Sequence, residues 1–147
     1  MPCLIASGVD RVEDCITFIT GKAAQTIFRQ CREALAPHGI TPVQYAVMQV
    51  LWEKDGQTGA EIGARLILDS ATITGVLDRL EKLGLVERRP DRTDRRVNRI
   101  CLTPKGKRQQ GVLEPEMDSL NRRIEDYLGS DSKKAWKILE RLAAFPS

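Results

Sequence analysis

Residues 58–103 read TGAEIGARLILDSATITGVLDRLEKLGLVERRPDRTDRRVNRICLT, and this stretch decides the fold. A first short helix is predicted at its start, because Thr58 and Glu61 have the spacing of a capping box. A second helix is predicted from Asp69 or Ser70, which are both favoured N-cap residues. Its apolar positions recur at the spacing of a helix that faces a core: Ile73, Val76, Leu77, Leu80 and Leu83.

The opposite face of the second helix is predicted to meet a nucleic acid. Its side chains are mostly short, so a nucleic-acid backbone can approach closely, and several of them donate or accept hydrogen bonds. A face used only for solvation is usually richer in Glu and Lys. Residues near the helix start suit base edges in a major groove, whereas an arginine one turn further on suits the phosphate backbone. The predicted contact residues are Ser70, Ala71, Thr72, Thr74, Gly75 and Arg79.

Two extended runs follow at 85–89 and 97–102, joined by a loop at 90–96, and Gly84 separates them from the helix as its expected C′ residue. Between positions 85 and 108 there are nine Lys or Arg against three Asp or Glu, so this segment carries +6 whereas the whole chain carries only +3. A charged loop alone is more often merely solvated. Helix, turn, helix and basic hairpin in this order, however, predict a winged helix-turn-helix, which is a DNA-reading module.

Helical patterns on both sides of this module predict a second layer. Residues 9–36 carry apolar side chains on two faces of one long helix, and one of these faces has no place in a single winged module. We therefore expect a mainly α fold with a small β-hairpin wing and a helical dimerisation layer built from both termini. The expected boundaries are 1–147 for a single domain, 41–103 for the winged helix-turn-helix DNA-binding region, and 9–37 and 104–146 for the dimerisation helices.

The composition is typical of a soluble globular protein, with 147 residues of which 41% are hydrophobic and 29% charged. No apolar run approaches the roughly eighteen residues of a membrane span. The N-terminus MPCLIASGVDRVEDC lacks the positive start of a secretory signal and meets acidic residues early. We therefore expect a cytoplasmic protein with no membrane partner.

Catalytic and metal sites are not expected. The cysteines Cys3, Cys15, Cys31 and Cys101 form no C-x-x-C pair, and the single histidine, His38, lies far from most of them. One histidine at a helix end offers no Ser-His-Asp or Cys-His constellation, and the glycines do not form a phosphate-binding loop. The sequence therefore predicts neither an enzyme nor a protein with a metal or another cofactor.

The segments ITPVQYAVMQVLW (40–52) and LDSATITGVLDRLEKLGLVERRPDRTDRRVNRICLTPKGK (68–107) resemble the MarR family of bacterial transcription regulators. Most specific is D-R-L-E-x-x-G-L-V-x-R, followed by D-x-x-D-R-R and L-T-x-x-G. The resemblance covers about residues 12–146 and is strongest over 40–107. It implies a homodimer that binds double-stranded DNA, usually as a repressor, and that a small molecule often releases. Two-fold symmetry in turn predicts a palindromic operator.

At the tip of the wing, Arg92, Arg95 and Arg96 are predicted to enter a minor groove, where narrow A·T segments strengthen the negative potential. Asp94 matches a family position that braces the tip by pairing with a nearby arginine, so the resemblance gives it a structural role. The sequence leaves open which arginine braces the tip and which arginines insert.

Two ways of sensing a signal compete. The resemblance implies a small-molecule pocket between the dimerisation layer and the winged module, and His38, Tyr45, Met48 and Arg65 are the candidate lining residues. The resemblance also implies that the effector is a small aromatic carboxylate or phenol, because related regulators with a similar T-P-x-Q-Y second helix often control aromatic-acid metabolism. A pocket between two helical layers would in addition be apolar, with a few polar groups to orient such a ligand. Arg65 would hold the carboxylate, although a contact of Arg65 with a DNA phosphate is an equal alternative.

The competing mode is oxidation of a thiol. Similar proteins that sense peroxides carry a reactive cysteine near the start of the first helix, and Cys15 lies close to that place. Its neighbours Ile16 and Phe18 offer nothing to lower a thiol pKa, so a simply buried cysteine is the favoured interpretation. A third hypothesis is a DNA-binding protein without any effector.

Overall fold

A computed structural model describes residues 11–146 of the chain. The α-helices are α1 (Ile16–Leu35), α2 (Pro42–Glu53), α3 (Gly59–Leu66), α4 (Ser70–Lys82), α5 (Pro104–Leu128) and α6 (Ser132–Ala143). The short 3-10 helices are η1 (Val12–Asp14), η2 (Ala36–His38) and η3 (Gly129–Asp131). The strands are β1 (Gln57–Thr58), β2 (Val86–Pro90) and β3 (Asn98–Leu102). The expected fold class, mainly α with a small wing, is confirmed.

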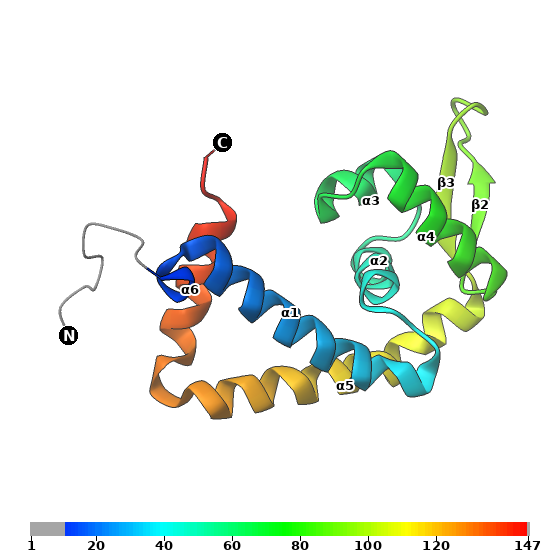
Figure 1. The fold of residues 1–147 in the computed structure, drawn as a ribbon. Coiled ribbons are helices and arrows are strands. Elements are labelled where there is room, and N and C mark those ends of the chain that lie inside the picture. The colour runs from blue at the N-terminus through cyan, green and yellow to red at the C-terminus, as the bar shows by residue number, and fades with distance from the viewer. Residues whose placement is uncertain (1–10, 147) are drawn as a thin grey trace.

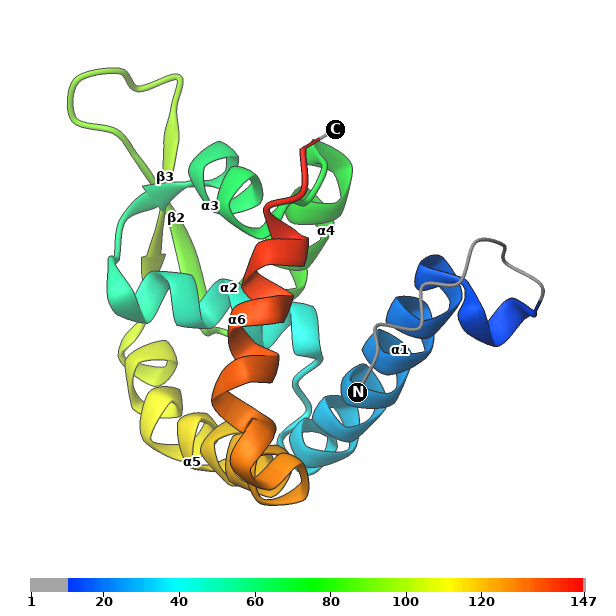
Figure 2. The ribbon, with the colours of Figure 1, turned by 90° about the vertical axis from the view of Figure 1, so that its left-hand side faces the viewer.

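The long helix α5 connects two groups of elements (Figure 1). One group comprises α2, α3, α4 and the sheet, which is the winged helix-turn-helix, and the other comprises α1 and α6. The helix α6 follows the C-terminal end of α5, whereas the C-terminal part of α1 lies beside the middle of α5, near Met117 and Arg123. Figure 2 shows that α1 and α6 stand apart from each other. No helix in the described part of the chain is both long enough and apolar enough to cross a membrane.

Side-chain caps fix the starts of four helices. Thr41, Thr58, Asp69 and Thr103 each accept a hydrogen bond from a backbone N–H of the first turn of α2, α3, α4 and α5, respectively. The Glu61 side chain accepts a hydrogen bond from the Thr58 N–H at 2.8 Å, and the Thr58 hydroxyl accepts one from the Glu61 N–H at 3.1 Å. These two bonds form the predicted capping box. Such a cap contributes about 1 kcal/mol to helix stability. The predicted starts of α3 and α4 are therefore confirmed.

A Schellman motif ends α4 and turns the chain into the wing. Gly84 has φ +70°, and its N–H donates to the carbonyl of Glu81 at 2.9 Å. The N–H of Leu85 donates to the carbonyl of Leu80 at 3.0 Å, and both leucine side chains are buried. This pair of bonds defines the motif, in which glycine is favoured because the C′ residue is left-handed. The predicted role of Gly84 is confirmed.

The start of α5 is fastened to the base of the wing. A Cβ atom at Gly106 would lie 2.0 Å from the carbonyl oxygen of Leu85, so only glycine allows this approach. Thr103 Oγ1 donates to the carbonyl of Gly84 at 2.6 Å, and Trp52 Nε1 donates to the carbonyl of Gly106 at 3.0 Å. These contacts hold α2, α5 and the wing in one arrangement.

The sheet has one strand more than the predicted hairpin. Its order is β1-β3-β2, with both pairs antiparallel and Gln57 opposite Ile100. β1 has only two residues, so it is too short for the alternation that reveals a strand in a sequence. The hairpin strands each begin one residue later than predicted, at Val86 and Asn98.

The N-terminal helix is shorter than the predicted 9–36. Cys15 has an extended backbone, with φ −79° and ψ 122°, and serves as the N-cap of α1. The residues just before it form η1, which is a separate turn. The prediction of a single helix is therefore wrong over its first turns, and its first residue, Val9, lies outside the described residues.

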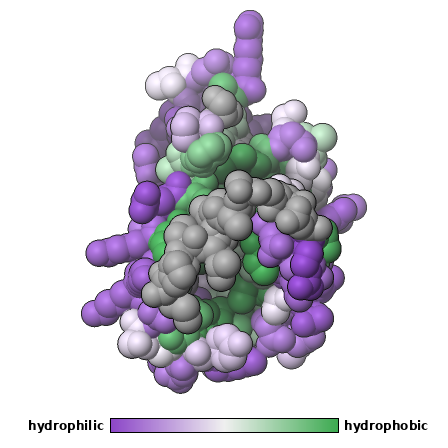
Figure 3. Space-filling view, turned by 60° about the vertical axis from the view of Figure 1, so that its left-hand side comes forward, coloured by the Kyte–Doolittle hydropathy of each residue, from purple (hydrophilic) through white to green (hydrophobic). Residues whose placement is uncertain are grey.

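The buried core belongs to the winged module and to its junction with α1 and α5. Its largest fully buried side chains include Leu35, Met48, Leu51, Ile62, Leu80, Ile100 and Leu113. α6 contributes no buried residue, and α1 contributes only Cys31 and Leu35 near its C-terminal end. The apolar residues left exposed on these two helices include Ile16, Phe28, Trp136, Leu139 and Leu142. Hydrophobic residues accordingly show on the surface of this side of the molecule (Figure 3).

Candidate nucleic-acid interface

The outward face of α4 carries the residues that the sequence predicted for DNA contact. Ile73, Val76, Leu77 and Leu80 fix its orientation, because they are buried. The predicted contact residues Ser70, Ala71, Thr72, Thr74 and Arg79 are all exposed, and Gly75 is half-buried. The structure therefore brings these residues together on one surface.

The two threonines on this face differ in their free hydrogen-bonding capacity. Thr74 Oγ1 donates to the carbonyl of Ser70 one turn earlier, at 2.7 Å, so its hydroxyl proton is already used. The Thr72 hydroxyl lies near the Asp69 carboxylate that caps α4 and accepts the Thr72 backbone N–H, but it closes no well-formed hydrogen bond with a described residue. Thr72 thus retains both a donor and an acceptor for a base edge.

The arginines of the wing fall into two groups. Arg88, Arg89 and Arg99 form ion pairs with carboxylates of the same module. Arg92, Arg95 and Arg96 form no ion pair with any residue between 11 and 146, and they lie exposed in the loop between β2 and β3. The unpaired group is therefore the set of tip arginines that the sequence predicted for the minor groove.

The brace of the wing tip is Asp91, in place of the predicted Asp94. Asp91 forms an ion pair with Arg99 on β3 and also accepts from the N–H and the hydroxyl of Thr93. The bonds from Thr93 and then from Arg99 hold the pKa of Asp91 well below its usual range. Asp94 accepts from the backbone N–H of Arg96 at 3.0 Å, and it pairs with no arginine side chain in the described residues.

The sequence order explains why this brace was missed. Pro90 pairs with Asn98 in the sheet, so Asp91 lies directly beyond the last pair and diagonal to Arg99. This register follows from the hairpin length, but the alternation pattern alone does not fix it, because a one-residue shift exchanges the faces of a strand.

Arg88 connects the recognition helix to the wing. Its guanidinium donates to Asp78 at 2.6 Å and to Glu81 at 2.5 Å, and both carboxylates lie on α4. The Arg88 side chain is 26% exposed, so the contacts are partly shielded from water. The angle between α4 and β2 is thereby fixed by a fork of two charge-assisted bonds.

The four predicted ligand residues lie in different surroundings in the single chain. Tyr45 and Met48 are buried core residues of α2, and Tyr45 packs edge-on against Trp52. Burial, followed by the charges of Glu114 and Asp118, raises the pKa of Tyr45 to about 12. Their proposed part in a ligand pocket stays a prediction.

The two polar members of that set have partners elsewhere. His38 Nε2 lies 3.1 Å from Glu116 Oε1 on α5. Arg65 forms an ion pair with Glu53 at 2.5 Å, and both side chains are about half exposed. Arg65 is thus neither aimed at the buried Tyr45 nor free of a carboxylate partner.

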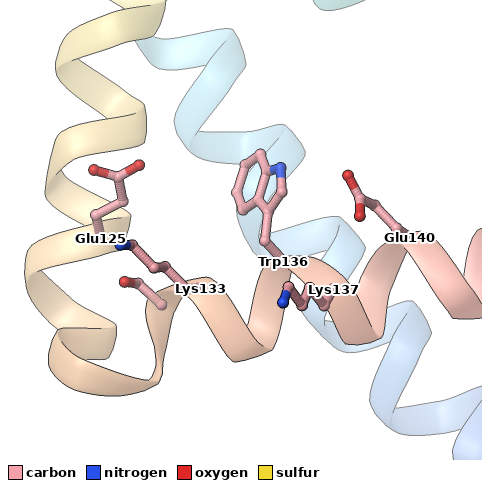
Figure 4. A pocket seen from close by; sticks show the side chains of 6 residues that line it. Glu125, Lys133, Trp136, Lys137 and Glu140 are labelled. Carbon is pink, nitrogen blue, oxygen red and sulfur yellow. The ribbon is translucent and has the colours of Figure 1, made fainter.

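Two pockets lie on the α1, α5 and α6 side. A pocket of about 310 Å³ between α1 and α5 is lined by Gln30, Glu33, Ala34, Glu116, Ser119, Leu120 and Arg123. A second, of about 390 Å³, lies where α6 leaves α5 and is lined by Glu125, Ser132, Lys133, Trp136, Lys137 and Glu140 (Figure 4). Neither pocket is lined by His38, Tyr45, Met48 or Arg65.

Cys15 has a different environment from the one predicted. It is the N-cap of α1, and the backbone N–H groups of Phe18 and then Thr17 lower the pKa of its thiol. The Cys15 side chain closes no cap hydrogen bond of its own. Burial raises the pKa of the Cys31 and Cys101 thiols. The prediction that nothing near Cys15 lowers its pKa is wrong, because it considered side chains and not the amides of a helix start.

The buried stripe of α4, its exposed face and the braced basic wing define the chain as a winged helix-turn-helix protein. Residues 40–97 match the MarR family. The regulator TtmR of Methylorubrum extorquens (strain PA1) is 40% identical over 129 residues, which are 88% of this chain and 64% of TtmR. The chain therefore spans slightly less than two thirds of that relative.

Two further relatives extend the comparison. YsmB of Bacillus subtilis (strain 168), named as an uncharacterized HTH-type transcriptional regulator, is 37% identical over 81% of this chain and 82% of its own length. The structure of overoxidized AbfR bound to DNA is 31% identical and covers 88% of this chain and 90% of that chain, with a TM-score of 0.71. The chain belongs to the MarR family of DNA-binding transcription regulators.

Proposed function

We propose that the protein is a homodimeric repressor that binds a palindromic operator through α4 and the wing. The observation that carries this proposal is the set of three unpaired arginines at the wing tip, next to a helix whose exposed face has small polar side chains. The paired wing arginines stiffen the hairpin, so the tip can present its charge at a fixed place.

The two parts of this surface have different tasks. Residues at the start of α4 read base edges in the major groove, and Thr72 is the principal candidate because its hydroxyl is free. The tip arginines contact a minor groove or its phosphates, and they supply affinity more than sequence preference. Arg79 contributes a phosphate contact one turn along α4.

A Thr72→Val variant tests the assignment of base reading. Valine keeps the shape of threonine and removes its hydrogen bonds, so the preference for one base should relax by about 1–3 kcal/mol. The measurement is the affinity for an operator selected from random DNA and for its single-base variants. Thr74→Val is the matched control with a smaller expected effect. An unchanged preference in Thr72→Val would remove Thr72 from the base-reading set.

A specific observation also favours a thiol response. The lowered pKa of Cys15 raises its thiolate fraction near neutral pH, and the thiolate is the form that reacts with peroxides. Attack on the O–O bond of a peroxide would give a Cys15 sulfenic acid and release an alcohol or water. The similar protein AbfR has been solved in overoxidized, reduced and disulfide forms.

Release from the operator separates this response from an aromatic effector. Wild-type protein should be released by cumene hydroperoxide, whereas Cys15→Ser should stay bound. Cys31→Ser, which changes a buried thiol, is the control that should still be released. Release by benzoates or cinnamates, lost in Arg65→Ala while that variant still binds DNA, would support the aromatic effector. If none of these compounds releases the protein from DNA, the protein is a regulator without an effector of these kinds.

A further inference from the structure

Ile67 is the only non-glycine residue between 11 and 146 with a positive φ, and this angle is +55°. It occupies the turn between α3 and α4. The Leu68 N–H donates to the Gly63 carbonyl at 2.8 Å, and the Ile67 N–H lies 3.4 Å from the Ala64 carbonyl. This is the bond pattern of a Schellman motif with Ile67 at its left-handed C′ position.

The same motif at the end of α4 contains Gly84, as the conformation requires. A β-branched residue is strained in the left-handed region, because its Cβ substituents meet the backbone. Glycine or asparagine would adopt this left-handed conformation with less strain than isoleucine. The fold of the chain therefore does not account for isoleucine at this turn.

Packing does not account for it either. Ile67 is 90% exposed, whereas its neighbours Leu66 and Leu68 are partly buried against the core. The apolar contact that usually accompanies a Schellman motif is thus made by Leu68, and the Ile67 side chain points into solvent. It is the combination of a strained backbone with a large exposed apolar side chain that points to an intermolecular contact.

The position of the turn identifies the molecule that makes this contact. Ile67 lies two positions before Asp69, the N-cap of α4, and three positions before Ser70, the first residue of the predicted base-reading face. α3, α4 and the wing lie together at one end of the molecule, away from the exposed apolar residues of α6 (Figure 1). The side chain therefore continues the surface that meets DNA.

We propose that Ile67 is a DNA-contacting residue that packs against apolar groups at the edge of the major groove, either thymine methyls or deoxyribose. This proposal rests on the proposed function, and it adds a contact to the hydrogen-bonding and charged residues already assigned. Thymine methyls are read by apolar side chains in the major groove.

The test is the Ile67→Gly variant, which removes both the strain and the side chain. Its Tm should rise by about 2–4 °C, because strain is relieved. Its affinity for an operator selected by the wild type should fall about three- to tenfold, because an apolar contact is lost. Ile67→Val, which keeps a β-branched apolar side chain, should retain most of the affinity. Gly84→Ile, which places the same side chain in the equivalent motif away from the start of α4, should lower Tm and leave affinity unchanged.

Thymine-to-uracil substitution along the operator distinguishes the two apolar groups. A position at which uracil weakens wild-type binding but not Ile67→Gly identifies a methyl contact, and the absence of such a position, with the loss of affinity intact, identifies deoxyribose. Unchanged operator affinity in Ile67→Gly overturns the inference about Ile67. Binding of the operator by the wild-type protein still supports the proposed function in that case. Dissociation of the Ile67→Gly dimer in sedimentation also overturns it, because Ile67 would then contact a second copy of the chain.

Discussion

Single residues show most clearly where the needs of folding and of binding diverge. Gly75 lies inside α4, where glycine is less favourable than alanine by about 1 kcal/mol. A Cβ atom there would meet no atom within 4 Å, so the packing of the chain does not require glycine. The proposed approach of DNA would account for glycine here, because a side chain at this position would hold the helix away from the groove.

Gly75→Ala should therefore stabilise the protein by about 1 kcal/mol and weaken operator binding by about 1–2 kcal/mol. Thermal unfolding and a binding titration on the same sample measure the two effects. Gly111→Ala is the matched control, since it also fills open space on a helix. The control should gain the stability and keep the affinity. Equal affinity in both variants would show that α4 does not approach DNA at Gly75.

At the scale of elements, the arginines on the strands of the wing form ion pairs, whereas those at its tip form none within the described residues. Replacing Arg95 or Arg96 by alanine should weaken binding to all sequences by a similar factor. Each loss should flatten the slope of log affinity against log salt by about one unit, because one fewer counterion is released. Arg122→Ala, an exposed arginine on α5, is the control. A salt slope that the wing variants share with this control would mean that the tip does not touch DNA.

The link between α4 and the wing can be tested separately. Arg88→Met keeps the length of the side chain but leaves Asp78 and Glu81 close together without a cation. We expect a loss of about 1–2 kcal/mol in the free energy of unfolding, since the ion pairs are only partly shielded from water. Urea unfolding measures this loss. Arg89→Met, which removes an exposed pair with Glu87, should cost less.

The sequence predicted these elements well where local signals are strong and less well where they depend on register. The caps at Thr58 and Asp69 and the glycine at position 84 act within one turn, so their residue types alone reveal them. β1 has two residues and is defined only by its pairing with β3. The choice of Asp91 over Asp94 also follows from strand register, which no local pattern encodes.

The candidate sites divide in the same way. The exposed residues of α4 that we propose for DNA contact could be predicted from the sequence, because they lie opposite a helical apolar stripe. A ligand pocket is harder to predict, because tertiary packing decides whether residues such as Tyr45 and Arg65 lie close together. Cys15 was misjudged because the groups that lower its pKa are backbone amides at a helix start whose position was predicted too early.

At the scale of the whole molecule, the contacts of α6 within one chain are too few to explain why this helix is stable. It has 12 residues, none of them buried, and its apolar side chains at Trp136, Leu139 and Leu142 are 43–56% exposed. Isolated helices of this length are marginal in water. A second copy of the chain that covers α1 and α6 would bury these side chains.

Leu139→Glu should therefore convert the protein from a dimer to a monomer. Sedimentation at micromolar concentration should change from twice 16.5 kDa to 16.5 kDa. Lys134→Glu makes a charge change on another part of α6 and should leave the dimer intact. A wild-type protein that sediments as a monomer would remove the basis for two-fold binding.

The most direct test of the central claim, that two copies of α4 and the wing read one operator, is selection of bound fragments from a random DNA pool. The proposed arrangement predicts an enriched inverted repeat whose half-sites are about 10 base pairs apart, or a multiple of this spacing, centre to centre. It also predicts A·T-rich steps at the outer positions where the wings would lie. Fragments without enrichment, or with a single half-site, would contradict the claim.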